Sequence, residues 1–177
     1  IKNKKTLILD ACSAPGGKTA QLLNAGLNVI AIDNDISRIK VMKENLERLR
    51  LDCPLINKNF LNWNETENEI TGILLDAPCS GTGTLRRNPD ILWHRKKEEI
   101  KKLTDLQLKL LKHSINLLKP GGCLVYTVCS IEPEEGLNIA KKISQFPEIE
   151  VSAISTLEMV KLKESITNEG FVQILPH

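Results

Sequence analysis

The fold is decided by residues 6–19, Thr6-Leu7-Ile8-Leu9-Asp10-Ala11-Cys12-Ser13-Ala14-Pro15-Gly16-Gly17-Lys18-Thr19, where an apolar run leads into a turn with two adjacent glycines. The run Thr6–Ala11 predicts a buried strand. The glycines permit a left-handed backbone or a close backbone approach, and a helix that begins near Lys18 offers N–H groups to an anionic ligand group. The stretch therefore predicts a strand–turn–helix unit that binds a nucleotide-like ligand.

Short apolar runs alternate with amphipathic ones along the rest of the chain. The further strands that this pattern predicts are Asn28–Ile32, Pro54–Lys58, Gly72–Asp76, Cys123–Val128, Glu148–Ile154 and Gly170–Leu175. Helical spacing of apolar residues predicts helices over Ile36–Leu49 and Lys97–Leu118. Alternating strands and helices are typical of βαβ units, so we expect an α/β fold: a doubly wound, mainly parallel sheet with helices on both faces.

Composition sets limits on the class of protein. A chain of 177 residues with 41% hydrophobic content is the size of one domain, and we expect residues 1–177 to form a single domain, trimmed at both ends from something longer. The net charge of +2 is too small to indicate a nucleic-acid partner by itself. The five cysteines lack metal-ligand spacing, so we expect no metal site and a reducing cytoplasm. No apolar run approaches the ~18 residues of a membrane span.

Three kinds of ligand compete for the glycine turn. A dinucleotide site would need G-x-G-x-x-G, which is absent. A P-loop would end in Gly-Lys-Thr as Gly17-Lys18-Thr19 does, but Cys12 stands where the leading glycine belongs and Pro15 lacks an amide donor. The run before Asp76 also resembles the Mg²⁺-binding strand of ATPases, so a P-loop ATPase stays as the alternative.

Asp33 favours the third kind of ligand, S-adenosylmethionine. It ends the second predicted strand, about twenty residues beyond the turn, where a carboxylate accepts both hydroxyls of a ribose. Its alternative role is to cap the helix that follows. Asn59 and Asp76 also follow strands, at the sheet edge where open α/β sheets bind ligands. The predicted cofactor residues are Cys12, Ser13, Ala14, Pro15, Gly16, Gly17, Lys18, Asp33, Asn59 and Asp76.

Two cysteines end or follow predicted strands, in Asp76-Ala77-Pro78-Cys79-Ser80-Gly81 and Thr127-Val128-Cys129-Ser130. Both positions are next to the expected cofactor edge, so Cys79 and Cys129 are the candidate catalytic thiols. The remaining cysteines, Cys12, Cys53 and Cys123, are expected to be small buried side chains or cofactor lining.

These motifs together resemble the NOL1/NOP2/Sun family of RNA cytosine-5 methyltransferases, over nearly the whole chain. The matching stretches are Asp10–Thr19, Ala31–Asp35, Leu74–Gly83 with Arg86–Asp90, and Tyr126–Glu135. The resemblance is strongest to the bacterial members that modify small-subunit ribosomal RNA. It implies S-adenosylmethionine as cofactor, Cys129 as the nucleophile and Cys79 as the residue that assists product release. Asn59 departs from the family, which usually has Asp there.

A thiol nucleophile suits this reaction because carbon 5 of cytosine is unreactive in the aromatic ring. Thiolate addition to carbon 6 makes carbon 5 enamine-like, and a base must later remove the carbon 5 proton. For RNA contact, the loop after Cys79 offers the basic residues Arg86, Arg87, Arg95, Lys96 and Lys97, with Trp93 for stacking. The alternatives are a solvated charged helix start and, for the whole chain, a non-catalytic RNA-associated module. We take a monomer as the expected state.

Overall fold

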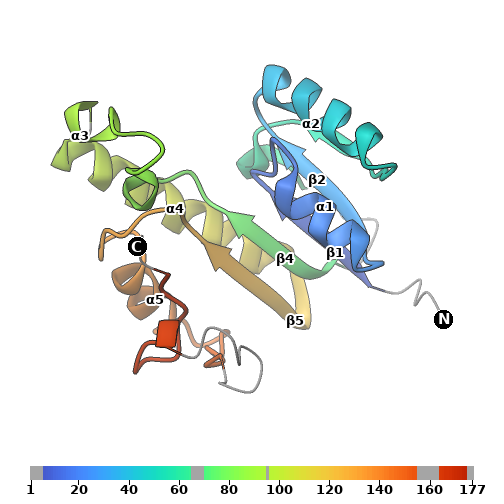
Figure 1. Ribbon diagram of the computed structural model, residues 1–177. Coiled ribbons are helices and arrows are strands. Elements are labelled where there is room, and N and C mark those ends of the chain that lie inside the picture. The colour runs from blue at the N-terminus through green and yellow to red at the C-terminus, as the bar shows by residue number, and fades with distance from the viewer. Residues whose placement is uncertain (1–5, 65–69, 95, 155–163, 175–177) are drawn as a thin grey trace. The chain divides into compact units, whose positions relative to one another are not determined.

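The computed structural model describes residues 6–64, 70–94, 96–154 and 164–174 (Figure 1). The chain divides into two compact units. The first unit comprises Ile1–Pro78 and Asp105–Val128, and the second comprises Cys79–Thr104 and Cys129–His177. The sequence expectation of a single catalytic domain stays a prediction, and each unit is described by itself.

The first unit is built on a parallel sheet of five strands in the order β3-β2-β1-β4-β5. The strands are β1 (Leu7–Ala11), β2 (Asn28–Asp33), β3 (Leu55–Asn57), β4 (Ile70–Asp76) and β5 (Leu118–Thr127). The order reverses between β1 and β4, which makes their carboxyl ends the switch point of a doubly wound fold. The predicted α/β fold is confirmed.

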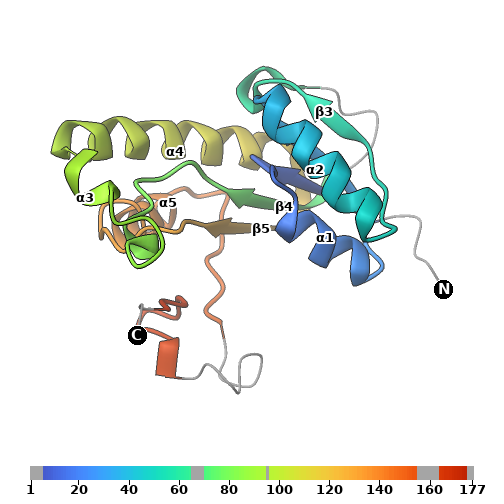
Figure 2. The same ribbon diagram turned by 45° about the horizontal axis from the view of Figure 1, so that its top comes forward.

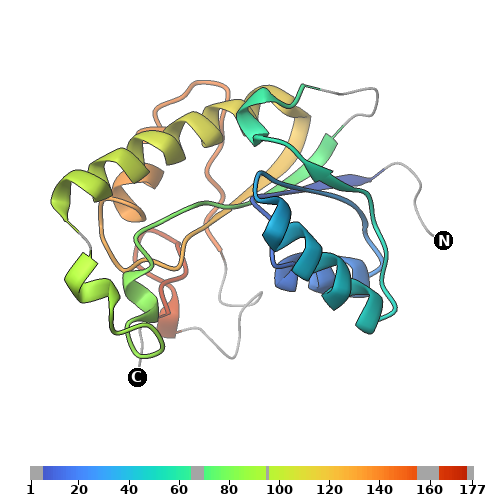
Figure 3. The ribbon, with the colours of Figure 1, turned by 90° about the horizontal axis from the view of Figure 1, so that it is seen from above.

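Helices lie on both faces of this sheet (Figure 3). Helices α1 (Gly17–Asn24) and α2 (Ile36–Arg48) lie on one face, and the part of α4 (Lys97–Leu117) that belongs to this unit lies on the other. This follows from handedness: right-handed crossovers that run in opposite directions along a sheet place their helices on opposite faces. Helix α2 packs against β2 and β3 (Figure 2). Its periodic apolar residues Ile39, Met42 and Leu46 are buried there, as the helical spacing predicts.

The middle strands are buried because helices cover both of their faces. Leu9, Ile32, Ile73 and Leu75 are at most 2% exposed, and all lie on β1, β2 or β4. Strand β5, at the end of the strand order, differs: Val125 is 48% exposed. The central strands therefore hold their carboxyl ends at fixed positions.

The second unit contains a 3-10 turn (Thr82–Thr84), helix α3 (Ile91–His94), the start of α4, and helix α5 (Leu137–Ile143). The strands predicted over Glu148–Ile154 and Gly170–Leu175 are wrong for the described residues. Only an isolated antiparallel bridge joins Ile166 and Val172, and Leu175 lies outside the described residues. Val151 and Ile154 are 42% and 38% exposed, so burial does not drive this segment into a sheet.

Among the residues that the structure describes, no helix is both long enough and apolar enough to cross a membrane.

Candidate functional site

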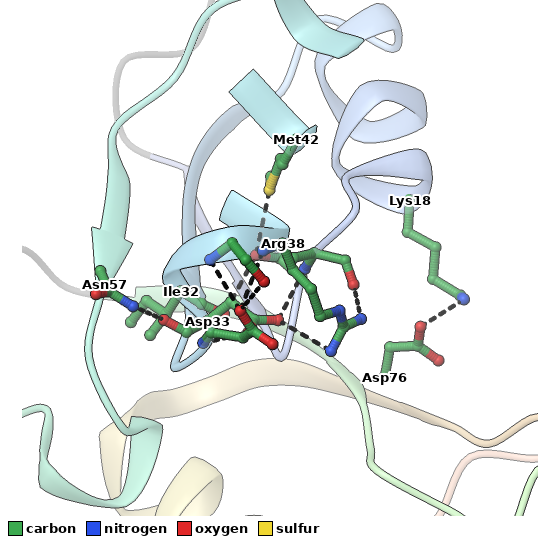
Figure 4. Close-up of polar contacts among 11 residues, drawn as sticks. Lys18, Ile32, Asp33, Arg38, Met42, Asn57 and Asp76 are labelled. Carbon is green, nitrogen blue, oxygen red and sulfur yellow. Dashed lines mark hydrogen bonds and ion pairs between the residues drawn. The ribbon is translucent and has the colours of Figure 1, made fainter. Parts of the chain in front are cut away.

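The glycine turn joins β1 to α1 and is held from one side by the end of β2 (Figure 4). The Ser13 N–H donates to the Ile32 carbonyl at 3.1 Å, and the Ser13 hydroxyl bonds the same oxygen at 3.2 Å. Gly16 has φ +95°, and a Cβ there would lie 2.7 Å from Cγ of Met42 on α2. Only glycine fits that position. The turn then delivers the first N–H groups of α1, which lack intrahelical acceptors.

Asp33 ends β2 with its side chain only 2% exposed. One carboxylate oxygen accepts the Ala14 N–H at 3.0 Å, and the other accepts the Asp35 N–H at 3.0 Å. Its alternative role as the cap of α2 is wrong. Asp35 is the cap and accepts the Ser37 N–H at 2.8 Å, and this Asp has its pKa lowered, chiefly by the Ser37 side chain. Asp33 therefore links the turn to the end of β2.

Arg38 was not anticipated from the sequence. Its guanidinium donates to the Ala14 carbonyl and lies 3.8 Å from the Asp33 carboxylate (Figure 4). It sits one helical turn into α2, three residues after the cap Asp35. The side chain is 51% exposed, so the cation covers the Asp33 carboxylate from the solvent side. The sequence gives little indication of this role, because a single Arg on a helix with several other basic residues is typical of an exposed side chain without a specific partner.

Lys18 and Asp76 meet at the ends of α1 and β4 (Figure 4). The Lys18 ammonium lies 2.7 Å from one Asp76 oxygen, and the Thr127 hydroxyl donates to the other at 2.8 Å. Two predicted cofactor residues are thus brought together, 58 positions apart in sequence. The pair is partly exposed, at 44% and 35% of the two side chains, so it is open to a ligand.

Asn59 has a local structural role. Its side-chain oxygen accepts the Leu61 N–H at 3.0 Å and caps the 3-10 helix Phe60–Asn62. Asn57, which was not a predicted site residue, donates from its amide to the Asp33 carbonyl at 3.2 Å (Figure 4). The cofactor role of Asn59 stays a prediction.

Burial alters the acidity of two groups next to the turn. It raises the pKa of Asp10 from 3.8 to about 6, although a hydrogen bond from Thr19 opposes the shift. Burial, with Asp33 nearby, likewise raises the pKa of the Cys12 thiol to about 12. Cys12 therefore stays a neutral thiol at physiological pH, as expected of a lining residue rather than a nucleophile.

The two candidate thiols lie together in the second unit, where Sγ of Cys79 is 3.3 Å from Sγ of Cys129. They come from positions 50 apart in sequence. The hydrogen bond to Cys129, together with burial, raises the pKa of Cys79 well above the ordinary thiol value. Cys129 is exposed, whereas Cys79 is half-buried. Cys79 therefore keeps its proton at neutral pH and the more accessible sulfur is Cys129.

A polar network that the sequence did not reveal lies beside these thiols. It centres on the carboxylate of Glu135, which is 0% exposed, and includes Ser80, Thr82 and Ser130. No signal distinguishes Glu135 in the sequence, because the run Glu132-Pro133-Glu134-Glu135 is typical of a solvated surface.

The other cysteines differ from one another. Cys53 is half-buried, packs against the Met42 and Leu46 cluster, and has its pKa raised to about 11 by burial. The expectation of burial is wrong for Cys123, which is exposed on β5, the last strand in the sheet order.

The basic residues predicted to contact RNA are on the surface. Arg86, Arg87, Lys96 and Lys97 are all exposed. Trp93 is 84% exposed, which is unusual for so large an apolar side chain. Arg95 lies outside the described residues.

The sequence of the chain matches a known protein family and its members. A family model described as 16S rRNA methyltransferase RsmB/F matches residues 1–177. Ribosomal RNA small subunit methyltransferase B of Shewanella oneidensis is 47% identical over 134 residues, which are 73% of this chain and 31% of the relative. The chain thus spans about a third of the length of such curated relatives.

Two solved structures share the fold at appreciable identity. The protein PH0851 has a TM-score of 0.79 and 31% identity, covering 86% of this chain and 36% of that one. NSun6 from Pyrococcus horikoshii, solved with an S-adenosylmethionine analogue, has a TM-score of 0.70 and 30% identity, covering 84% and 41%. Because the family model spans all 177 residues, the chain belongs to the RsmB/F family of 16S rRNA methyltransferases.

Proposed function

We propose that the protein transfers a methyl group from S-adenosylmethionine to carbon 5 of a cytosine in small-subunit ribosomal RNA, through a covalent cysteine adduct. The observation that carries the proposal is the 3.3 Å separation of the Cys79 and Cys129 sulfurs. Family membership confirms the resemblance inferred from the sequence and makes S-adenosylmethionine, rather than ATP, the cofactor. We further propose that the protein acts as a monomer in the cytoplasm, where thiols stay reduced.

The turn Cys12–Lys18, Asp33, Asn59 and Asp76 form the proposed cofactor site. The N–H groups at the start of α1 suit the cofactor carboxylate, and the ribose hydroxyls suit Asp33. A carboxylate has about four lone-pair positions, and two on Asp33 are taken by backbone N–H groups. Arg38 lies 3.8 Å from the carboxylate and its side chain is 51% exposed, so the proposal has it move toward solvent when the ribose binds.

Cys129 is the proposed nucleophile because it is the more exposed sulfur, next to a partner that retains its proton. Its thiolate bonds to carbon 6 of cytosine, the ring electrons move to carbon 5, and carbon 5 takes the methyl group from the cofactor. Once Cys129 is bonded to carbon, the main cause of the raised Cys79 pKa is gone. Cys79 then loses its own proton to solvent and, as a thiolate, removes the carbon 5 proton. The electron pair of that C–H bond forms the double bond between carbons 5 and 6 again as the bond to sulfur breaks, and Cys129 leaves as a thiolate.

The experiment uses a chimaera in which this chain replaces the matching region of the Shewanella oneidensis relative. Cys129→Ala should abolish methyl transfer while S-adenosylmethionine still binds. Cys79→Ala should accumulate a covalent protein–RNA complex, visible on a denaturing gel, because addition proceeds and elimination stalls.

Cys123→Ala is the matched control, since it removes another exposed thiol. The Cys123→Ala chimaera should turn over at the wild-type rate and should accumulate no covalent protein–RNA complex. A trapped complex with Cys129→Ala instead would reverse the two roles, and turnover in both variants would contradict the covalent mechanism.

A further inference from the structure

The two loops that carry the catalytic thiols are joined by a set of short-range polar contacts inside the second unit. The Gly83 N–H donates to the Cys129 carbonyl at 3.0 Å, and the Ile131 N–H donates to the Thr82 hydroxyl at 3.1 Å. The Ser130 hydroxyl lies 3.0 Å from Oγ of Ser80 and 3.2 Å from Oγ1 of Thr82. These contacts therefore fix the positions of residues 79–84 and 129–131 relative to one another.

Glu135 contributes the charged member of this set. Its two carboxylate oxygens lie 2.9 and 3.2 Å from the N–H of Ser80, the residue directly after Cys79, and the Ser80 hydroxyl also donates to it. Glu135 and Ser80 are both 0% exposed. Burying a carboxylate is costly unless several donors satisfy it, and hydrogen bonds to a charged acceptor are about twice as strong as neutral ones.

The chain also fixes Glu135 relative to Cys129. The Glu135 N–H donates to the Glu132 carbonyl at 3.1 Å, and the Glu132 N–H donates to the Ser130 hydroxyl at 3.0 Å. These bonds connect Ser130, the residue after Cys129, to the main chain of Glu135. The Glu135 carboxylate in turn binds Ser80, the residue after Cys79.

We propose that Glu135 is a positioning residue that sets the distance between the Cys79 and Cys129 sulfurs by anchoring Ser80. It acts on the sulfurs through the loop that carries Ser80. Its importance for catalysis rests on the function proposed above, but its effect on the thiol pair does not require methyl transfer. The geometric claim is therefore testable on the 177-residue chain alone.

The test measures the effective concentration of one thiol at the other. The chain is equilibrated with oxidised and reduced glutathione. In this equilibrium the Cys79 and Cys129 thiols are oxidised to one disulfide, and one molecule of glutathione disulfide is reduced to two of glutathione. The linked peptide is quantified by mass spectrometry after acid quenching, which separates it from products of the other cysteines. The variants are Glu135→Ala, Glu135→Gln and Ser80→Ala, with Glu134→Ala as the control because Glu134 is an exposed neighbouring carboxylate.

We expect Glu135→Ala to lower the effective concentration by about tenfold or more, because small displacements of paired reactive groups have large effects. Glu135→Gln keeps an oxygen for the Ser80 N–H and should recover most of the loss, while Ser80→Ala should show an intermediate loss. Glu134→Ala should match the wild type. A purely structural role would lower thermal stability without moving this equilibrium.

An unchanged effective concentration in folded Glu135→Ala protein would overturn the proposal. If Glu135→Ala does not fold, Glu135→Asp decides, because it keeps the carboxylate but is one methylene shorter on the side that bonds the Ser80 N–H, and a wild-type value for it would equally overturn the proposal. Failure of the proposed function gives a different result, namely turnover by the Cys129→Ala chimaera, so the two outcomes are distinguishable.

Discussion

At the residue scale, Asp10 makes the stability of the fold depend on pH. It is 0% exposed at the end of β1, and burial raises its pKa from 3.8 to about 6. The folded state therefore binds this proton more tightly than the unfolded state. The resulting contribution to stability is fully present below pH 3.8 and is lost as the pH rises through about 6, with a magnitude of about 3 kcal/mol at 1.36 kcal/mol per pH unit.

Asp10→Asn removes this dependence. The free energy of unfolding of Asp10→Asn should exceed that of the wild type by most at neutral pH. This difference should shrink as the pH falls toward 4, because protonation of Asp10 then removes the cost of burying its charge in the wild type. Urea unfolding across that range provides the measurement. Asp52→Asn is the control, since Asp52 is exposed. A difference between wild type and Asp10→Asn that stays constant with pH would contradict the raised pKa.

Among the predicted cofactor residues, Asp33 is the one whose substitution should weaken S-adenosylmethionine binding most. Asp33→Ala removes the predicted ribose contact and two bonds from backbone N–H groups that shape the turn. Loss of a charged hydrogen bond costs about 1.5–3 kcal/mol, so S-adenosylmethionine binding should weaken by roughly ten- to a hundredfold. Calorimetric titration of the chain measures this. An affinity equal to that of Asp52→Ala, in folded Asp33→Ala protein, would remove Asp33 from the cofactor site.

At the scale of elements, the loop from Cys79 to Thr84 can lie against the other cysteine loop only because Gly83 lacks a side chain. A Cβ on Gly83 would lie 2.9 Å from the carbonyl oxygen of Cys129, which is backbone and cannot rotate away. Gly83→Ala should therefore push the loops apart and destabilise the protein by about 1–3 kcal/mol. Gly136→Ala is the control, because its Cβ would meet nothing nearer than 3.8 Å. Equal unfolding free energies for the two variants would show that the loops adapt.

Elements whose signals are local were predictable from the sequence. Helix α2 was predicted to within a residue at its end, and β2 likewise, because hydrophobic periodicity and caps lie within the segment itself. The strand predicted over Glu148–Ile154 failed because alternation alone does not supply a partner strand. Strand β5 begins at Leu118, not Cys123, because Leu118 pairs with Ile70 across an irregularity that only the neighbouring strand reveals.

Some residues of the candidate site were likewise predictable from the sequence, and others depend on tertiary packing. The glycine turn, Asp33 and Asp76 follow or end strands of the first unit, and topology alone predicts that they lie at one edge of its sheet. Cys79 and Cys129 also follow strands, and the structure brings them together within the second unit. Arg38 and Glu135 could not be identified this way. Each is one charged residue among several on a polar segment, and only tertiary packing turns Glu135 inward and lays Arg38 across Asp33.

At the scale of the whole molecule, a nearly neutral chain carries local charge after Cys79, at Arg86, Arg87 and Lys96. If these side chains contact phosphates, replacing all three by Ala in the chimaera should lower RNA affinity. The slope of log affinity against log salt should also fall, by about 0.7 for each lost contact to single-stranded RNA.

The matched control replaces Lys40, Lys43 and Arg48, which are exposed on α2 and change the net charge equally. Filter binding over a salt series should show a wild-type slope for this control. Equal slopes for both triple variants would mean that the charges after Cys79 act only through net charge.

The chain has two tryptophans, and their surroundings are opposite: Trp63 is 2% exposed and Trp93 is 84% exposed. An indole in water emits at longer wavelength than a buried one, and a dissolved collisional quencher such as iodide reaches only the exposed ring. Emission from the two residues is therefore separable without any label. RNA that stacks on Trp93 would shield it from iodide while Trp63 stays unaffected, so the intrinsic fluorescence of this protein reports binding at one known side chain.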